Sequence, residues 1–125
     1  MLIRSVNEIV GTTHDVEWGN GTSRRLLVDA DDLGFSLTET YVRPGTESYL
    51  RYDNHVEVCY CVHGAGSVES EDGLFEIRPG MLYSPGKGEP HVLRSSSGMT
   101  LMCVFTPALR GPEKHLLVPG VHSSY

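Results

Sequence analysis

Short apolar or alternating runs, separated by turn residues, make up most of this sequence. They cover residues 25–28, 33–42, 48–52, 56–63, 67–70, 74–78, 81–84, 91–95 and 99–105. Alternation of apolar and polar side chains is typical of strands with one buried face. Glycine and proline fall between the runs, where turns need them. The pattern predicts an all-β protein, a barrel or a sandwich built from many short strands.

The two ends of the chain differ from this pattern. Ser5 and Glu8 have the spacing of a capping box, which predicts one short helix over residues 5–9. After Phe105 the periodicity is lost, so we expect residues 106–125 to form a wrapped or flexible C-terminal tail. Since 125 residues is the usual size of one domain, residues 1–125 are predicted to form a single domain.

The composition of the chain limits the kinds of partner that it can bind. Ten Lys and Arg face sixteen Asp and Glu, a net charge of −6 without a long block of either sign, which argues against nucleic acid and anionic lipid. No apolar run reaches the roughly 18 residues of a membrane span, and the N-terminus lacks a signal-peptide core. We expect a cytoplasmic protein with a small-molecule partner, and reduced thiols at Cys59, Cys61 and Cys103.

Glu57 is the first candidate for metal binding. In a strand it shares a face with Cys59 and Cys61, because side chains two apart point the same way. A carboxylate is costly to bury unless it is paired or binds a cation. Taken alone, Glu57 fits the solvated face of an antiparallel strand better. Together with Tyr83 and His91 it predicts a pocket for a divalent first-row metal.

Residues 44–66 and 78–94 resemble the two motifs of the cupin superfamily in their spacing. The resemblance implies a cupin-type, jelly-roll-like β-barrel. The superfamily normally has histidines where Arg51 and Asp53 stand in this chain, so two usual ligands are missing. Glu57 and His91 remain, and Tyr83 is the best candidate for a third ligand.

A narrower resemblance is carried by the strings TSRRLLV, GFS, NHVE, YC, IRPGMLY and CVF. These resemble the ectoine synthase family, over residues 1 to about 115. The resemblance implies a lyase that closes N-γ-acetyl-L-2,4-diaminobutyrate to ectoine with loss of water, the last step in making a compatible solute against osmotic stress. In that family iron is held by a Glu, a Tyr and a His, which match Glu57, Tyr83 and His91. Fe(II) is therefore the expected cofactor.

The same resemblance implies substrate-binding residues. Arg24, Thr40, Cys103 and Phe105 match family positions. Arg24 would hold the substrate carboxylate through a bidentate contact, and Cys103 with Phe105 would form an apolar wall. Without the resemblance, Arg24 reads as a surface residue, and Cys103 and Phe105 read as core packing.

For proton transfer the candidates are Glu113, His115 and Tyr52, since an imidazole can serve as acid or base near neutral pH. One departure from the family concerns the pocket wall: a family tryptophan is replaced by Gly21. Trp18 lies three residues earlier, and the sequence leaves open whether its ring takes that place.

Two other functions fit the same pattern. One is a cupin module that binds a small ligand without turning it over; the other is a metal-dependent cupin enzyme acting on a different amino acid derivative. In every case the edges of the sheets favour pairing of two copies, so we expect a homodimer.

Overall fold

The computed structural model describes residues 1–125. Its one α-helix is α1 (Val6–Ile9), and a 3₁₀ helix covers Asp29–Asp31. The strands are β1 (Asp15–Glu17), β2 (Thr22–Leu27), β3 (Ser36–Val42), β4 (Thr46–Leu50), β5 (Val56–Gly64), β6 (Gly66–Ser70), β7 (Gly73–Ile77), β8 (Leu82–Tyr83), β9 (His91–Ser95) and β10 (Met99–Thr106). The predicted all-β fold with one short helix is confirmed.

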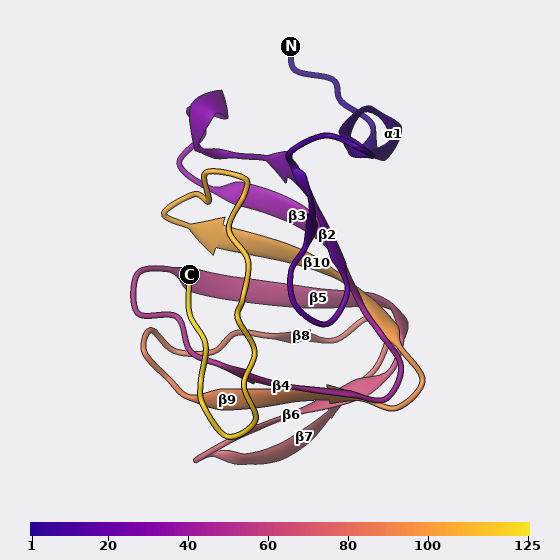
Figure 1. The fold of residues 1–125 in the computed structure, drawn as a ribbon, viewed down its shortest axis with the longest axis vertical. Helices are drawn as coiled ribbons and strands as arrows, with labels where there is room; N and C mark the ends of the chain where they lie inside the picture. Colours follow the sequence, from indigo (N-terminus) through magenta and orange to yellow (C-terminus); the bar gives the residue numbers. More distant parts are fainter.

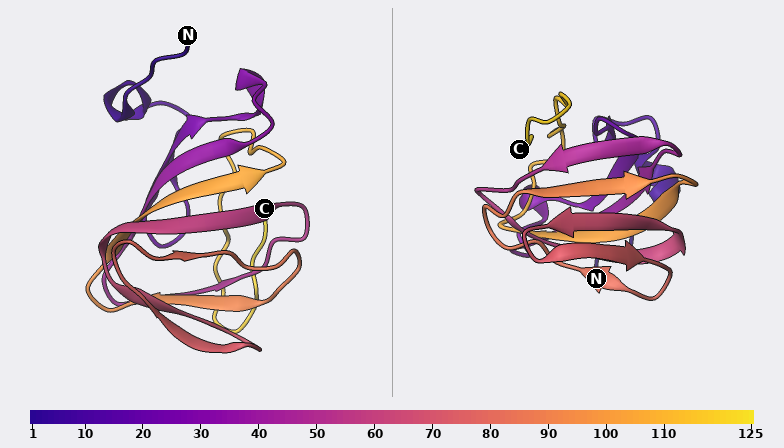
Figure 2. Two further views of the ribbon diagram at one scale, coloured as in Figure 1. Left: turned by 180° about the vertical axis from the view of Figure 1, so that it is seen from behind. Right: turned by 90° about the horizontal axis from the view of Figure 1, so that it is seen from below.

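Two antiparallel sheets form the body of the molecule (Figure 1). The larger has the order β1-β2-β3-β10-β5-β8 and the smaller has the order β4-β9-β6-β7. Strands that are neighbours in space are often distant in sequence, as in a jelly roll. The view from behind shows both sheets curving around a shared interior (Figure 2).

Several strands differ from the predicted runs: β2 begins at Thr22 rather than at residue 25, β3 at Ser36 rather than at residue 33, and β4 covers Thr46–Leu50 rather than 48–52. Strand β1 was not predicted, because three residues are too few to show an alternation; it is held by pairing of Val16 with Ser23. Strand β8 is shorter than expected, since only Leu82 and Tyr83 pair with β5. Neither α1 nor the 3₁₀ helix has the length and apolar character needed to cross a membrane.

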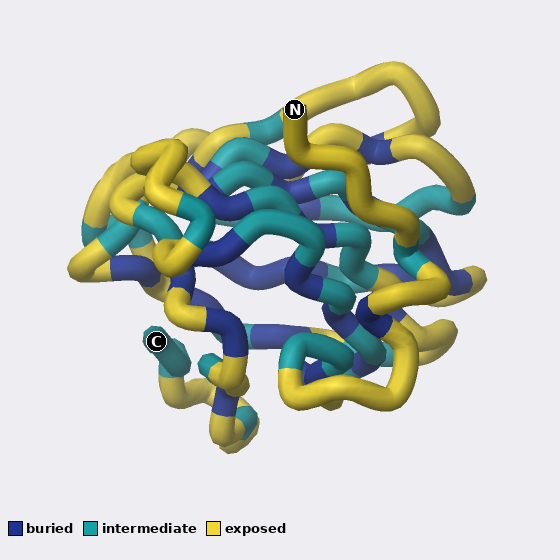
Figure 3. The backbone as a smooth tube through the Cα atoms, turned by 90° about the horizontal axis from the view of Figure 1, so that it is seen from above, coloured by how far each residue is buried: buried dark blue, intermediate teal, exposed yellow.

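The core lies between the sheets, where the strand alternation places it. Along β10 every second residue is buried: Met99, Leu101, Cys103 and Phe105. Seen from above, buried segments follow the middle of the strands, whereas the N-terminal residues are exposed (Figure 3). The strand faces that meet in the core therefore also determine which side chains line any interior site.

The chain beyond β10 runs across the strands of both sheets and turns back (Figure 1). The N–H of His115 donates to the carbonyl of Trp18 at 2.8 Å. Further on, Ser123 forms a parallel bridge with Leu50 of β4. Its N–H donates to the carbonyl of Tyr49 at 2.9 Å. These contacts attach the C-terminal segment to the body of the protein.

Candidate metal centre and substrate pocket

An interior cavity lies between the two sheets. It is lined by Trp18, Ser23, Thr40, Leu50, Tyr52, Glu57, Cys59, Tyr83, Leu93, Leu101, Cys103, Phe105 and Tyr125. The space in it that water can occupy is about 30 Å³, which is room for only one or two water molecules. Since most of the lining is apolar, the few polar groups in it define its chemistry.

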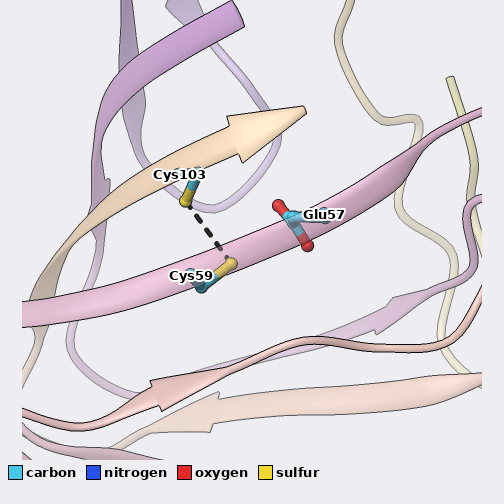
Figure 4. A group of neighbouring side chains, drawn as sticks. All are labelled: Glu57, Cys59 and Cys103. Atoms are coloured by element: carbon cyan, nitrogen blue, oxygen red, sulfur yellow. Dashed lines mark hydrogen bonds between the residues drawn. The ribbon is translucent and has the colours of Figure 1, made fainter. Parts of the chain in front are cut away.

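Strand register brings five of these side chains to one place. Glu57 of β5 lies opposite Phe105 of β10, and Cys59 lies opposite Cys103. On its other side Cys59 lies opposite Tyr83 of β8. Opposed residues in antiparallel strands point to the same face, so all of them face the cavity. Figure 4 shows Glu57, Cys59 and Cys103 in this arrangement.

His91 lies on β9 of the other sheet and lines a neighbouring pocket rather than the cavity itself. It pairs with Leu50 and lies two residues before Leu93, both of which line the cavity. Its Nδ1 is 3.0 Å from the carbonyl oxygen of Glu89. A carbonyl only accepts, so Nδ1 carries the hydrogen and Nε2 has a free lone pair. That Nε2 atom is buried without a hydrogen-bond partner. Buried polar atoms are rarely left without a partner, so this nitrogen is a candidate metal ligand.

Tyr83 stands between the other two predicted ligands. It lines the cavity together with Glu57, and it lines an adjoining pocket together with His91. Burial raises the pKa of Tyr83 well above its ordinary value and lowers the pKa of His91. The three predicted ligands thus come from β5, β8 and β9. An acidic, a phenolic and an imidazole donor suit a hard or borderline divalent cation.

Burial of Glu57 has a consequence for stability. Desolvation raises its pKa from 4.5 to about 7, and the Cys59 thiol offsets a part of this. Between these pH values the folded carboxyl keeps a proton that the unfolded chain has lost. The contribution of Glu57 to the free energy of unfolding therefore falls as the pH rises through this window.

We expect Glu57→Gln to be more stabilising at pH 8 than at pH 5, by on the order of 3 kcal/mol, in the metal-free protein. Burial lowers the pKa of His115 to about 3, so its contribution to the free energy of unfolding rises with pH between about 3 and its ordinary value. This contribution is the same in the wild type and in the variant and cancels from the difference. Urea unfolding of the wild type and of the variant at the two pH values measures the difference. Equal differences at both pH values would contradict the assignment of a buried carboxyl.

Arg24 is not placed at the cavity. It lies between Asp15 of β1 and Glu39 of β3 in the register of the sheet, and its guanidinium is 3.5 Å and 3.6 Å from their carboxylates. The adjacent residues Ser23 and Arg25 have the buried, inward positions. Because a one-residue step reverses the face of a strand, Arg24 lies on the face opposite to Ser23 and Arg25. Its expected contact with the substrate stays a prediction.

Arg25 takes the inward position instead, with only 1% of its surface exposed. Its Nη1 donates to the carbonyl of Gly111 at 2.6 Å, and its Nη2 to the carbonyl of Glu113 at 2.7 Å. Nη2 also lies 3.3 Å from the hydroxyl of Tyr125. No carboxylate forms an ion pair with it. A buried guanidinium without a counter-ion favours an anionic ligand nearby.

The other expected substrate residues do line the cavity. Thr40 hydrogen-bonds through its hydroxyl to Ser23 and to Thr38, each at 2.9 Å. Cys103 and Phe105 lie on the wall formed by β10. The structure therefore brings these three positions together, with a hydroxyl cluster on one side and an apolar surface on another.

Tyr52 and His115 form a buried pair. The Tyr52 hydroxyl is 2.7 Å from Nε2 of His115, whose Nδ1 is 2.9 Å from the hydroxyl of Ser123. Burial, with the positive charge of Arg25 adding to it, lowers the pKa of His115 to about 3, so the ring is neutral. A neutral imidazole accepts at one nitrogen and donates at the other, so a change of tautomer can pass a proton along this chain.

Glu113 is placed differently from His115. Its carboxylate accepts the N–H groups of Arg110 and Gly111 at 2.7 Å and 2.8 Å. Partial burial works against ionisation, but these donors outweigh it and hold the pKa of Glu113 below its ordinary value. The carboxylate does not line the cavity. The hydrogen bonds of Glu113 stabilise the tail, and its expected role in proton transfer stays a prediction.

Trp18 occupies part of the cavity wall. Its side chain is 4% exposed, and its indole N–H donates to the carbonyl of Tyr41 at 2.9 Å. A Cβ atom at Gly21 would lie 1.9 Å from that same carbonyl oxygen and 3.1 Å from the indole nitrogen. The question left open by the sequence is thus decided: the indole of Trp18 fills the wall and Gly21 leaves room for it.

Gly21→Ala is accordingly expected to destabilise the protein by about 2 kcal/mol or more, because strand backbone must move. Gly80→Ala provides a partial control, since a Cβ there meets no atom within 4 Å, though its φ of +91° adds backbone strain. Thermal unfolding of the two variants measures the difference. A smaller loss for Gly21→Ala than for Gly80→Ala would contradict the crowding of the indole.

Seven residues that line the cavity were not predicted from sequence as site residues: Trp18, Ser23, Leu50, Cys59, Leu93, Leu101 and Tyr125. For Cys59 a signal existed, because it shares a strand face with Glu57. Tyr125 gave none. Its ring stacks on that of His115 at 4.3 Å, a contact made only because the tail returns to the cavity.

This fold and this donor set define a cupin-type protein with a candidate metal site inside the barrel. Its structure is similar to a cupin 2 conserved barrel domain protein from Salinispora arenicola, with a TM-score of 0.67 at 16% identity over 85% of this chain and 88% of the other. At that identity the likeness concerns the fold alone.

The chain belongs to the ectoine synthase family, whose model matches residues 1–123. It is 47% identical to the L-ectoine synthase of Desulfatibacillum aliphaticivorans over 92% of each chain. It is 39% identical to that of Oceanobacillus iheyensis, over 92% of this chain and 91% of the other. The crystal structure of ectoine synthase from P. lautus matches with a TM-score of 0.84 at 43% identity, covering 89% of this chain and 81% of that chain. The resemblance inferred from sequence, and the ectoine synthase function it implies, agree with these findings.

Proposed function

We propose that this chain closes N-γ-acetyl-L-2,4-diaminobutyrate into ectoine with loss of water, using Fe(II) held by Glu57, Tyr83 and His91. The observation that carries the metal site is the buried Nε2 of His91, which has no hydrogen-bond partner. Membership of the ectoine synthase family supports the reaction. When bound, the ion would supply Lewis acidity to polarise the amide carbonyl, a contribution of several kcal/mol to lowering the barrier.

The surrounding residues would bind the substrate carboxylate and exclude water from the cavity. Arg25 has five N–H donors, and four of its contacts are to Ser23, two tail carbonyls and the hydroxyl of Tyr125. Displacement of the Tyr125 hydroxyl would leave two donors free for a substrate carboxylate. Phe105 and Trp18 keep bulk water from a cavity in which water is the product.

Proton transfer is assigned to the Tyr52–His115 pair. The phenol is neutral, because burial raises the pKa of Tyr52 well above its ordinary value. Ring closure takes two protons in all from the attacking amine and delivers two to the departing oxygen, one when the hemiaminal forms and one when water leaves. A hydroxyl in contact with a neutral imidazole can accept one proton and release another without forming a buried charge.

The activity is tested with purified protein, Fe(II) and N-γ-acetyl-L-2,4-diaminobutyrate. We expect ectoine to appear by chromatography, and one iron per chain by elemental analysis. Iron without product would favour a different substrate for the same site. Product formation that is unaffected by removal of metal with a chelator would contradict the metal-dependent mechanism.

We also propose that the protein forms a homodimer and is located in the cytoplasm. Exposed apolar side chains follow the outer face at one edge of the larger sheet: Tyr60 and Val62 of β5 are 45% and 43% exposed, and Leu82 of β8 is 62% exposed. Apolar side chains in a row at a sheet edge favour burial against a second copy. Light scattering of the wild type and of Leu82→Asp tests the pairing, which the variant is expected to weaken.

A further inference from the structure

Cys59 and Cys103 face each other inside the cavity. They lie directly opposite in the β5–β10 register, and their sulfur atoms are 3.5 Å apart. Both are free and almost fully buried. The carboxylate of Glu57 completes a group whose three ligand atoms lie within 4.8 Å of one another (Figure 4).

The separation of the sulfurs matches one kind of bond better than another. A disulfide brings two sulfurs to about 2.05 Å, which would require the two strands to approach. Two sulfurs bound at about 2.3 Å to one tetrahedral ion lie about 3.8 Å apart. The observed distance of 3.5 Å is close to the second value. Without an ion, the Cys103 thiol donates a hydrogen bond to the sulfur of Cys59 at this distance, and binding of an ion would replace that hydrogen bond.

We propose that Cys59, Cys103 and Glu57 form a site for a thiophilic tetrahedral cation of the Zn²⁺ or Cd²⁺ class. Soft thiolates select such ions, whereas a carboxylate, phenolate and imidazole set suits iron. Binding forms two metal–sulfur bonds and releases the two thiol protons to solvent. No oxidant or reductant is needed.

This site shares Glu57 with the proposed iron site, and that consequence rests on the proposed function. A cation held by the two sulfurs would draw Glu57 away from Tyr83 and His91 and would occupy the wall that faces the substrate. Thiophilic cations are therefore expected to inhibit the enzyme by displacing iron. The thiolate site itself depends only on the three donors on β5 and β10.

The test uses Cd²⁺ added to the reduced, metal-free protein, observed through the sulfur-to-cadmium charge-transfer absorption in the ultraviolet. We expect the band to saturate at one ion per chain. Cys59→Val and Cys103→Ala should abolish it. Cys61→Ala is the matched control and should keep it, because the Cys61 thiol is directed to the carbonyls of His63 and Gly64.

His91→Ala separates this proposal from the iron site. The variant should lose iron and keep the cadmium band, whereas Cys59→Val should lose the band whether or not the protein makes ectoine. Circular dichroism confirms that each variant is folded, and Cys59→Ser serves if the valine variant is not. Absence of the band in the wild type, or its persistence without Cys59, would overturn the proposal.

Discussion

His91→Ala is expected to bind no iron and to lose about a thousandfold in activity. The Nε2 atom of His91 is the one ligand candidate that is buried, neutral and without any other partner. Alanine removes a donor that no neighbouring side chain replaces. Loss of a Lewis acid worth about 4 kcal/mol corresponds to about three powers of ten in rate.

The measurement is iron content together with turnover, before and after chelation and resupply of Fe(II). Resupply should restore the wild type and leave His91→Ala inactive. His63→Ala is the matched control, since His63 is exposed at the end of β5 and should keep both iron and activity. A His91→Ala protein with full iron content would show that the ligand lies elsewhere.

Arg25→Met is expected to raise the KM for substrate by one to two powers of ten and to lower the free energy of unfolding by about 2 to 4 kcal/mol. A charge-assisted hydrogen bond to the substrate carboxylate is worth about 1.5 to 3 kcal/mol, which sets the first effect. The second follows because two buried carbonyls, those of Gly111 and Glu113, lose their donors.

Arg24→Met is the matched control. Its partners are Asp15 and Glu39 on the outer side of the sheet, at 3.5 Å and 3.6 Å, and such partly exposed ion pairs contribute about 1 kcal/mol or less. Urea unfolding and steady-state kinetics of the two variants give both quantities. A larger effect of Arg24→Met on KM would restore the assignment made from sequence.

The tail contributes Tyr125 to the wall of the cavity. Nη2 of Arg25 is 3.3 Å from the hydroxyl of Tyr125, whose ring stacks on that of His115, and only about 30 Å³ of the cavity is open to water. We expect the ring of Tyr125 to move when the substrate binds. The same movement would free the donors of Arg25 for the substrate carboxylate.

Much of the site was predictable, because strand alternation is a local property. The period of two predicts that Glu57 shares a face of β5 with Cys59, and that Cys103 shares a face of β10 with Phe105. That the face of Glu57 is the buried one was implied by the family resemblance and not by the alternation. The substrate contact of Arg24 stays a prediction: in the structure Arg24 lies beside Asp15 and Glu39, and Arg25 has the buried position. Two adjacent arginines fit the motif equally well by residue type, and they differ only in the face of the strand from which each side chain projects.

The sequence by itself determined the all-β class, the short helix at Ser5, and which residues of a strand share a face, because turn chemistry and side-chain alternation act over a few residues. Which face of β5 is buried was decided by the packing of the two sheets: Val56, Tyr60 and Val62 are exposed, and Glu57 is buried. Tertiary structure decided the rest. The indole of Trp18 beside Gly21, the stacking of Tyr125 on His115, and the approach of Cys59 to Cys103 join segments distant along the chain. Such contacts depend on which strands become neighbours, and no local pattern encodes that order.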